Sequence, residues 1–288
     1  MVSGVTVLEV IRRTTEFFQG KGIDSPRLQA ELLVADELKM PRLRLYLDFE
    51  RTLDADQLAR LREKVRRRAR GEPLQLILGT ANFCGFELRV TRGVLIPRPE
   101  TEVLAEAAWE WLKASPGGQK GRVLDLGTGS GCLAIALALK CPDVEVWAAD
   151  VSEAAIEVAK ENIRRHGLQD RVRLLQGDGF GALPAGLRFE AIVSNPPYIP
   201  DEEIASLPPE VRDWEPRVAL AGGKDGLAVI RRLAAEGRSR LKPEGRLFME
   251  FADGQEAQAR RIFEEAGWKE VEIRPDLSGS PRILIAAP

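Results

Sequence analysis

The residues best suited to chemistry are Asn195 and the two prolines that follow it, at the end of an apolar run over residues 189–193. This short run predicts a buried strand. Each proline fixes its own φ and lacks an N–H, and the residue before a proline is held extended. The side-chain oxygen of Asn195 and the carbonyl of Pro196 can then accept both hydrogens of a planar –NH2 group, with Tyr198 on its flat face. The segment is therefore predicted to bind an amide or an exocyclic amine, although a proline-stiffened loop without a ligand has the same pattern.

A glycine-rich loop, Gly-Thr-Gly-Ser-Gly at residues 127–131, follows an earlier predicted strand and opens a predicted helix. Glycines allow a tight turn and close approach of the backbone to a ligand. The spacing is not the Gly-x-Gly-x-x-Gly of dinucleotide enzymes, because Cys132 stands where the third glycine is needed. No Lys-Ser/Thr pair follows, so a triphosphate loop is not expected either. Asp125, just before the loop, favours a cationic ligand over a phosphate.

Acidic residues end or follow the next two predicted strands. Asp150 ends the second strand, where a carboxylate can bind both hydroxyls of a ribose. Asp178 follows the third strand and offers a carboxylate to an adenine amine, while Gly179 and Phe180 supply a wall for its ring. With Asn195 after the fourth strand, consecutive strands each deliver a polar group to the carboxyl edge. Ligands bind at this edge in open α/β sheets.

The elements that position these residues alternate between strand and helix from residue 121 onward. The predicted strands span residues 123–126, 144–149, 172–175, 189–193, 246–251, 271–274 and 282–286. The predicted helices span residues 130–139, 152–165, 226–239 and 255–266. This alternation indicates a parallel sheet with helices on both faces. The last two strands are separated by a short turn and must pair antiparallel, so the prediction is a seven-stranded, mostly parallel α/β sheet.

The chain before this sheet predicts a small helical domain over residues 1–72, because its apolar residues recur at helical spacing. Residues 73–95 are predicted to form a hairpin linker and residues 96–288 the sheet domain. The last helix of the small domain carries seven basic residues against a single Glu63: Arg60, Arg62, Lys64, Arg66, Arg67, Arg68 and Arg70. This helix presents either an ordinary solvated face or a surface that attracts a polyanion.

Composition excludes several classes of protein. The net charge of the 288 residues is −2, so no global field recruits nucleic acid. Cys84, Cys132 and Cys141 lack metal-ligand spacing, which predicts reduced thiols in a cytoplasmic protein. His166 is the only histidine, so histidine triads and histidine-rich metal sites are not expected. The sequence has no apolar run of about 18 residues, so neither a membrane span nor a signal peptide is expected.

Asp-Leu-Gly-Thr-Gly-Ser-Gly at 125–131, together with Asn-Pro-Pro-Tyr at 195–198, resembles the class I S-adenosylmethionine-dependent methyltransferases that act on a planar amino nitrogen. Further segments resemble the HemK-type (PrmC) peptide chain release factor glutamine methyltransferases. These are Ile-Pro-Arg-Pro-Glu-Thr-Glu at 96–102, Ser-Asn-Pro-Pro-Tyr-Ile at 194–199, Glu-Pro-Arg-Val-Ala-Leu at 215–220 and Gly-Gly-Lys-Asp-Gly-Leu at 222–227. The resemblance covers nearly the whole chain, including the helical domain.

The sequence departs from the family pattern in two places. Residues 249–255 read Met-Glu-Phe-Ala-Asp-Gly-Gln, where the family more often has Glu-Ile-Gly before the glutamine. Gly179 stands where relatives often carry a bulky residue against the adenine. These departures concern local contacts and not the class of enzyme.

The resemblance implies a Rossmann-like fold, S-adenosylmethionine as cofactor, and methylation of the side-chain amide in the Gly-Gly-Gln motif of class 1 release factors. It implies no metal, and nucleic acid is not required. The cofactor-binding residues carried over are Gly127, Thr128, Gly129, Ser130, Gly131, Asp150, Asp178, Gly179, Phe180 and Asn195. The catalytic residues are Asn195, Pro196 and Tyr198, and the substrate-binding residues are Asn195, Pro196, Pro197 and Tyr198. The helical domain is expected to dock the release factor.

Two other functions stay open from the residues alone. An adenine N6-methyltransferase on DNA or RNA would use the same –NH2 site, and the arginine-rich helix would hold phosphates. The net charge and the lack of an obvious base-recognition domain argue against it. A non-catalytic module that binds ribosomes or nucleic acid would use the arginine-rich helix and need no cofactor.

Overall fold

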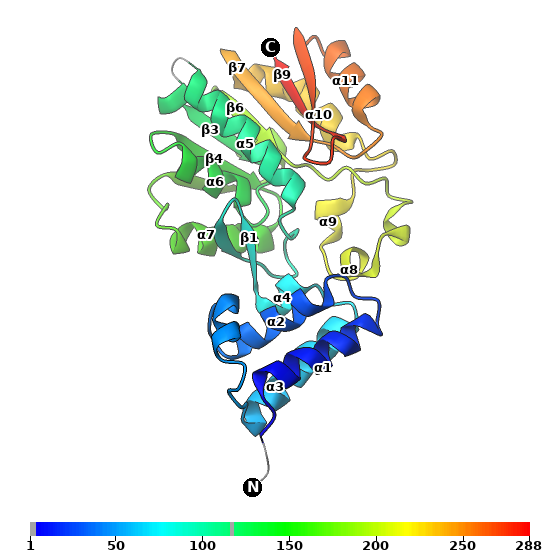
Figure 1. The fold of residues 1–288 in the computed structure, drawn as a ribbon. Helices are drawn as coiled ribbons and strands as arrows, with labels where there is room; N and C mark the ends of the chain where they lie inside the picture. Colours follow the sequence, from blue (N-terminus) through cyan, green and yellow to red (C-terminus); the bar gives the residue numbers. More distant parts are fainter. Residues whose placement is uncertain (1–3, 116–117) are drawn as a thin grey trace. The chain divides into compact units, whose positions relative to one another are not determined.

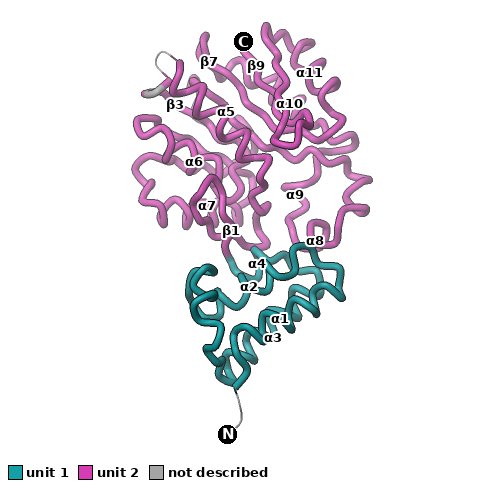
Figure 2. The backbone as a smooth tube through the Cα atoms, in the orientation of Figure 1, with its two compact units in different colours: residues 1–79 teal, residues 80–288 magenta. Residues whose placement is uncertain are grey.

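The structure of the protein is a computed structural model that describes residues 4–115 and 118–288. The chain divides into two compact units, Met1–Gly79 and Thr80–Pro288 (Figure 2). The sequence predicted the end of the helical domain at residue 72, whereas the first unit continues to Gly79. The cause is a short helix, α4 (Leu74–Leu78), whose Ile77 is buried in the core of that unit.

The first unit is helical, as predicted. It contains α1 (Val7–Gln19), α2 (Pro26–Glu37), the 3-10 helix η1 (Arg42–Leu47), α3 (Ala55–Ala69) and α4. Helix α3 begins after Asp54, whose side chain accepts from the Gln57 backbone at 2.8 Å. The Gln57 side chain accepts from the Asp54 backbone in return, so a capping box sets the start of the helix.

The basic residues of α3 are largely bound within their own unit. Lys64 binds Asp36 and Glu37, Arg60 binds Glu37, Arg67 binds Glu72, and Arg68 binds Gln29. Arg68 is only 4% exposed. Internal partners therefore neutralise much of the charge that a polyanion would need, while Arg60 and Arg66 keep exposed side chains as on a solvated face.

The second unit opens with a hairpin of β1 (Thr80–Phe83) and β2 (Phe86–Arg89), which pair antiparallel around Cys84 and Gly85. The hairpin occupies residues 80–89, a shorter stretch than the hairpin linker predicted over residues 73–95, because residues 74–78 form α4. Helix α5 (Pro99–Ala114) follows, and then the main sheet (Figure 1).

The main sheet has the seven predicted strands: β3 (Arg122–Leu126), β4 (Glu145–Asp150), β5 (Val172–Gln176), β6 (Phe189–Ser194), β7 (Leu241–Glu250), β8 (Glu270–Pro275) and β9 (Pro281–Ala287). Their order in space is β5-β4-β3-β6-β7-β9-β8. The first five are parallel, while β9 runs antiparallel to β7 and β8. The chain order reverses between β3 and β6, and a crevice is expected outside the carboxyl ends of the strands at such a point.

Helices cover both faces of the sheet, as predicted. One core joins α5, α6 (Cys132–Lys140) and α7 (Glu153–Arg165) to one face, and contains Leu104, Ala134 and Val193. The other joins α10 (Ala228–Arg240) and α11 (Glu256–Glu265) to the opposite face, and contains Leu233 and Phe263. Successive strand residues point to opposite faces.

Short helices complete the unit: η2 (Gly118–Lys120), η3 (Gly179–Ala182), η4 (Ile204–Ser206), α8 (Pro209–Arg212) and α9 (Arg217–Leu220). Across residues 4–115 and 118–288, the structure has no helix with the length and apolar character that crossing a membrane requires.

Candidate active site

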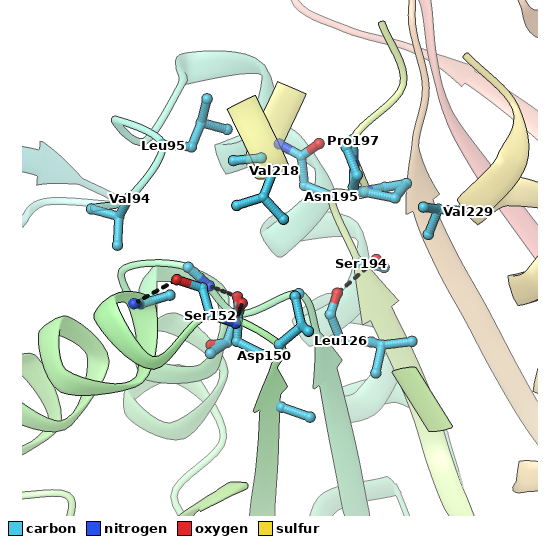
Figure 3. A pocket seen from close by; sticks show the side chains of 18 of the residues that line it. Val94, Leu95, Leu126, Asp150, Ser152, Ser194, Asn195, Pro197, Val218 and Val229 are labelled. Atoms are coloured by element: carbon cyan, nitrogen blue, oxygen red, sulfur yellow. Dashed lines mark hydrogen bonds between the residues drawn. The ribbon is translucent and has the colours of Figure 1, made fainter. Parts of the chain in front are cut away.

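A cavity of about 320 Å³ lies at the carboxyl edge of the sheet. The loops after β3, β4, β5 and β6 all line it, as the strand-end residues predicted. Figure 3 shows Asp150 and Ser152 on one side, with Asn195 and Pro197 on the other. Of the predicted site residues, only Gly131 and Tyr198 are outside the lining. Thr101, Val218 and Arg232 are lining residues that the sequence analysis did not assign to the site.

The glycine loop turns through backbone conformations that favour glycine. Gly127, Gly129 and Gly131 have φ values of 79°, 55° and 83°. The Gly129 N–H donates to Asp150 Oδ2 at 2.9 Å, and the Ser152 N–H donates to Asp150 Oδ1 at 2.9 Å. Asp150 is thus held by the loops of two neighbouring strands, at the edge where the sequence placed it.

Asp125 does not line the cavity, but its side chain is hydrogen-bonded to the glycine loop. Its Oδ2 accepts from Thr128 Oγ1 at 2.6 Å and from the Ala134 N–H at 3.0 Å, so it connects the loop to α6. Burial raises the pKa of Asp125 to about 7, against the effect of these two hydrogen bonds. The full negative charge inferred from the sequence is therefore only partly present at neutral pH, because burial disfavours the ionised form.

Asn162 supports the loop from α7. Its side chain accepts from the Arg89 N–H at 2.7 Å, and donates to Arg89 O at 2.9 Å and to Ser130 O at 2.8 Å. One buried carboxamide therefore binds the end of the hairpin and the glycine loop together.

In the loop after β5, the Asp178 carboxylate predicted to bind an adenine amine already has a partner in the protein, Arg232. Asp178 is bound to Arg232 at 2.5 Å, and its side chain is 73% exposed. Gly179 has a φ of 56°, and a Cβ placed there would lie 2.6 Å from Arg232 Cζ. The Arg232 guanidinium therefore fills the space that a bulky residue at this position would need, and it lines the cavity itself. Phe180 is buried in the core beneath the cavity.

Asn195 lies where β6 ends, beside the end of β3. Ser194 Oγ donates to Leu126 O at 2.7 Å and ties the two strand ends together (Figure 3). The Asn195 Nδ2 donates to Thr101 Oγ1 at 2.9 Å. With its nitrogen occupied in this way, the carboxamide keeps its oxygen as an acceptor.

Tyr198 does not line the cavity, and its place on the flat face of the –NH2 group stays a prediction. Its hydroxyl donates to Glu250 Oε1 at 3.1 Å, and its carbonyl accepts from Gln255 Nε2 at 3.0 Å. Burial, followed by the nearby Glu250 carboxylate, raises the pKa of the Tyr198 phenol. The hydroxyl of this half-buried phenol finds in the buried acid the hydrogen-bond partner that it needs.

Glu250 is the main residue that sequence reasoning missed. It ends β7, is 1% exposed, and accepts from Thr101 Oγ1 at 2.7 Å. Thr101 falls within a segment that resembles the family, and Glu250 within the segment at 249–255 that departs from it. Their positions in the sequence do not indicate that the two side chains are in contact. Glu250 and Gln255 both contact the Asn195–Tyr198 loop, so the departure at residues 251–254 leaves these two contacts in place.

The remaining motif segments also meet at the site. Arg98 binds Glu215, and Ile199 pairs with Ala221 in a parallel bridge. Val218, which follows Glu215, lines the cavity next to Asn195 (Figure 3). The segments at 96–102, 194–199 and 215–220 are therefore neighbours in space.

Comparison with known proteins identifies both parts of the chain. Residues 9–79 match the PrmC N-terminal domain, and residues 102–207 match the methyltransferase small domain. The release factor glutamine methyltransferase of Rhodopirellula baltica is 40% identical over 281 residues, covering 97% of this chain and 95% of that protein. That of Chlorobaculum tepidum is 42% identical over 285 residues, covering 97% and 96%. The crystal structure of a methyltransferase from Pyrococcus furiosus matches 81% of this chain and 98% of its own, with a TM-score of 0.53 at 20% identity. This last likeness concerns the fold alone.

Proposed function

The chain belongs to the release factor glutamine methyltransferase family, and from this premise we infer that it methylates a glutamine side-chain amide in a release factor. The methyl donor is S-adenosylmethionine, and the acceptor is the glutamine of the Gly-Gly-Gln motif in class 1 peptide chain release factors. The observation that supports this most directly is the Asn195 carboxamide, whose nitrogen is bound to Thr101 and whose oxygen stays free to accept from an –NH2 group.

The residues of the cavity fit the cofactor. A Cβ at Gly127 or Gly129 would meet nothing within 4 Å, so the loop borders open space. Both Asp150 oxygens are anchored by backbone N–H groups and keep further lone pairs for the hydroxyls of a ribose. Ser130 Oγ, which lines the cavity, is buried without a hydrogen-bond partner among the described residues. Asp178, Gly179 and Phe180 would lie against the adenine. When bound, the cofactor supplies an electrophilic methyl group on a sulfonium.

The chain's own contribution is to prepare the acceptor nitrogen. An amide nitrogen is a poor nucleophile because its lone pair is delocalised into the carbonyl. Asn195 Oδ1 and the Pro196 carbonyl accept hydrogen bonds from the two N–H groups of the acceptor amide. These bonds favour a more pyramidal nitrogen and orient its lone pair for in-line attack. The same acceptors stabilise the positive charge that develops on the nitrogen before one of its protons passes to solvent.

The helical unit is proposed to dock the release factor. A glutamine side chain has few atoms, so the –NH2 site alone cannot select one glutamine among many. Selectivity then requires a second surface, and the first unit contributes nothing to the sheet. Deleting this unit is expected to abolish methylation of intact release factor and to leave cofactor binding in place.

Adenine, the second acceptor considered from the sequence, would fit the same –NH2 site, but nothing in the geometry favours it over glutamine. The basic residues of α3 that would hold phosphates are largely bound within their own unit. A non-catalytic module likewise has no need for the anchored Asp150 or the oriented Asn195. Within residues 4–115 and 118–288, no cluster of three or more His, Cys, Asp or Glu side chains offers a metal site. A cytoplasmic location stays a prediction.

The decisive experiment offers purified release factor, duplex DNA and RNA separately to the enzyme with methyl-labelled cofactor. Mass spectrometry then locates the label. The proposal requires label on the Gly-Gly-Gln glutamine. Label on adenine and none on that glutamine would establish the other acceptor.

A further inference from the structure

We propose that Glu250 is a positioning residue for methyl transfer, which acts through Thr101 to hold the Asn195 carboxamide with its oxygen toward the acceptor. The proposal rests on the function inferred above. It assigns a role to two side chains that the strand-end pattern did not reveal.

Glu250 is a buried acid bonded only to neutral groups. Its Oε2 accepts from Thr101 Oγ1 at 2.7 Å, and its Oε1 accepts from the Tyr198 hydroxyl at 3.1 Å. Among the described residues, no ion pair joins Glu250 to a basic side chain. A buried carboxylate without a cation is costly to a fold, and such groups are frequent at functional sites.

Glu250, Thr101 and Asn195 form a series of hydrogen bonds, here called the relay. The direction of each of these bonds follows from the ionised state of Glu250. A carboxylate only accepts, so the Thr101 hydroxyl must donate its proton to Glu250. The Thr101 oxygen then has lone pairs but no proton for Asn195. The carboxamide must therefore present its nitrogen to Thr101, at 2.9 Å, which leaves its oxygen for the acceptor.

Without an ionised Glu250 this order is no longer enforced. The Thr101 hydroxyl can then donate to the Asn195 oxygen, and the carboxamide can turn over. A turned carboxamide would present its own –NH2 to the –NH2 of the acceptor, donor against donor. The relay thus determines whether the site accepts hydrogen bonds from its substrate.

The relay predicts a dependence on pH. Burial raises the pKa of Glu250 to about 7, against the hydrogen bonds from Thr101 and Tyr198. The other charged groups that act on it are Arg282 of β9, which lowers its pKa, and Glu100 of α5, which raises it. Below this pKa the acid is protonated and can donate to Thr101, so the order of the relay is no longer enforced. Methyl transfer should therefore rise with pH through about 7.

The test is Glu250→Gln, which keeps the size of the side chain and removes its charge. Its kcat should fall about 10- to 100-fold, the scale seen when a group that orients a site residue is lost. Cofactor affinity, measured by calorimetry, should be retained. The part of the dependence of kcat on pH near 7 that comes from Glu250 should disappear, leaving any part that comes from Asp125, whose pKa is also about 7. Thr101→Val should lose a similar amount, and Thr101→Ser, which keeps the hydroxyl, should recover most of that loss.

Matched controls separate positioning from folding. Glu190→Gln removes a carboxylate near the start of the adjacent strand β6, far from the site edge, and should leave kcat unchanged. The Thr101→Val/Glu250→Gln double variant should lose no more than the worse single variant, because both interrupt one relay. Thermal unfolding shows whether each variant is folded.

Two results would overturn the proposal. One is a loss of kcat in the double variant equal to the product of the losses in the two single variants, and the other is a Glu250→Gln enzyme with wild-type kcat. If Glu250→Gln does not fold, the wild-type profile still decides, because a kcat that is flat across pH 7 contradicts the relay. Failure of wild-type enzyme to label the glutamine would instead refute the proposed function.

Discussion

The Arg98 guanidinium binds both carboxylate oxygens of Glu215, at 2.7 and 2.8 Å, although the two residues are 117 positions apart in the chain. The pair joins the segment before α5 to the segment before α9. Glu215 is buried, and this burial raises its pKa against the attraction of Arg98. The pair therefore holds together two segments that border the active site.

Replacing Arg98 with alanine should destabilise the fold, because Glu215 would remain buried without its cation. The expected loss is about 3 kcal/mol of unfolding free energy, measured by urea denaturation. In the Arg98→Ala/Glu215→Gln double variant, the neutral amide needs no cation, so part of the stability should return. A double variant as unstable as Arg98→Ala alone would contradict this explanation.

Asp150 is expected to hold the cofactor ribose. Asp150→Ala should weaken S-adenosylmethionine binding by about 1.5–3 kcal/mol, the range for hydrogen bonds to a charged group. Asp150→Asn keeps one acceptor oxygen and should lose less. Titration calorimetry measures both variants, and unchanged affinity in Asp150→Ala would remove this residue from the site.

Asn195 is expected to act on the acceptor more than on the cofactor. Asn195→Ala removes one oriented acceptor and should slow methyl transfer about 100-fold or more. Single-turnover measurements report the transfer step, and calorimetry on the same variant reports cofactor affinity, which should change far less. Near-normal turnover would be incompatible with the proposed mechanism.

Gly179 tests the packing of Arg232 against the cavity. In Gly179→Ala the new Cβ would lie 2.6 Å from Arg232 Cζ, at a φ of 56°. The left-handed backbone alone should cost about 1–2 kcal/mol of unfolding free energy. Cofactor binding should also weaken, because Arg232 must move. Gly186→Ala is the control, since Gly186 also has a positive φ, of 73°, and a Cβ there meets nothing within 4 Å. Equal effects at the two glycines would refute the role of Arg232.

The sequence predicts the strand-end residues of this site better than the contacts between them. Asp150 and Asn195 follow apolar runs, and parallel strands bring such positions to one edge, so their neighbourhood could be predicted. Thr101 and Glu250 are 149 positions apart, and they meet because α5 packs beside β7, a pairing that no local pattern records. The hydrogen bond from the Tyr198 hydroxyl to Glu250 could not be predicted for the same reason.

The extent of the helical unit and the role of its arginines were also hard to predict. Helix α4 is short, and Ile77 is recognisable as a core residue only once its neighbours are in place. Arg60 and Lys64 of α3 have their acidic partner Glu37 on α2, so their charge is balanced across helices, where no local pattern records it.

Asn162 links the glycine loop to the end of the hairpin through hydrogen bonds to Ser130 and Arg89. Its carboxamide binds Arg89 and Ser130, so order in the glycine loop favours order in the chain that leaves the hairpin toward Val94 and Pro97. Those two residues line the same cavity as the glycine loop. Linkage is reciprocal: the factor by which bound cofactor strengthens acceptor binding equals the factor by which bound acceptor strengthens cofactor binding. Hydrogen exchange of residues 90–97, with and without cofactor, would measure this coupling. One buried asparagine would thus let each of the two substrates favour the binding of the other, whichever binds first.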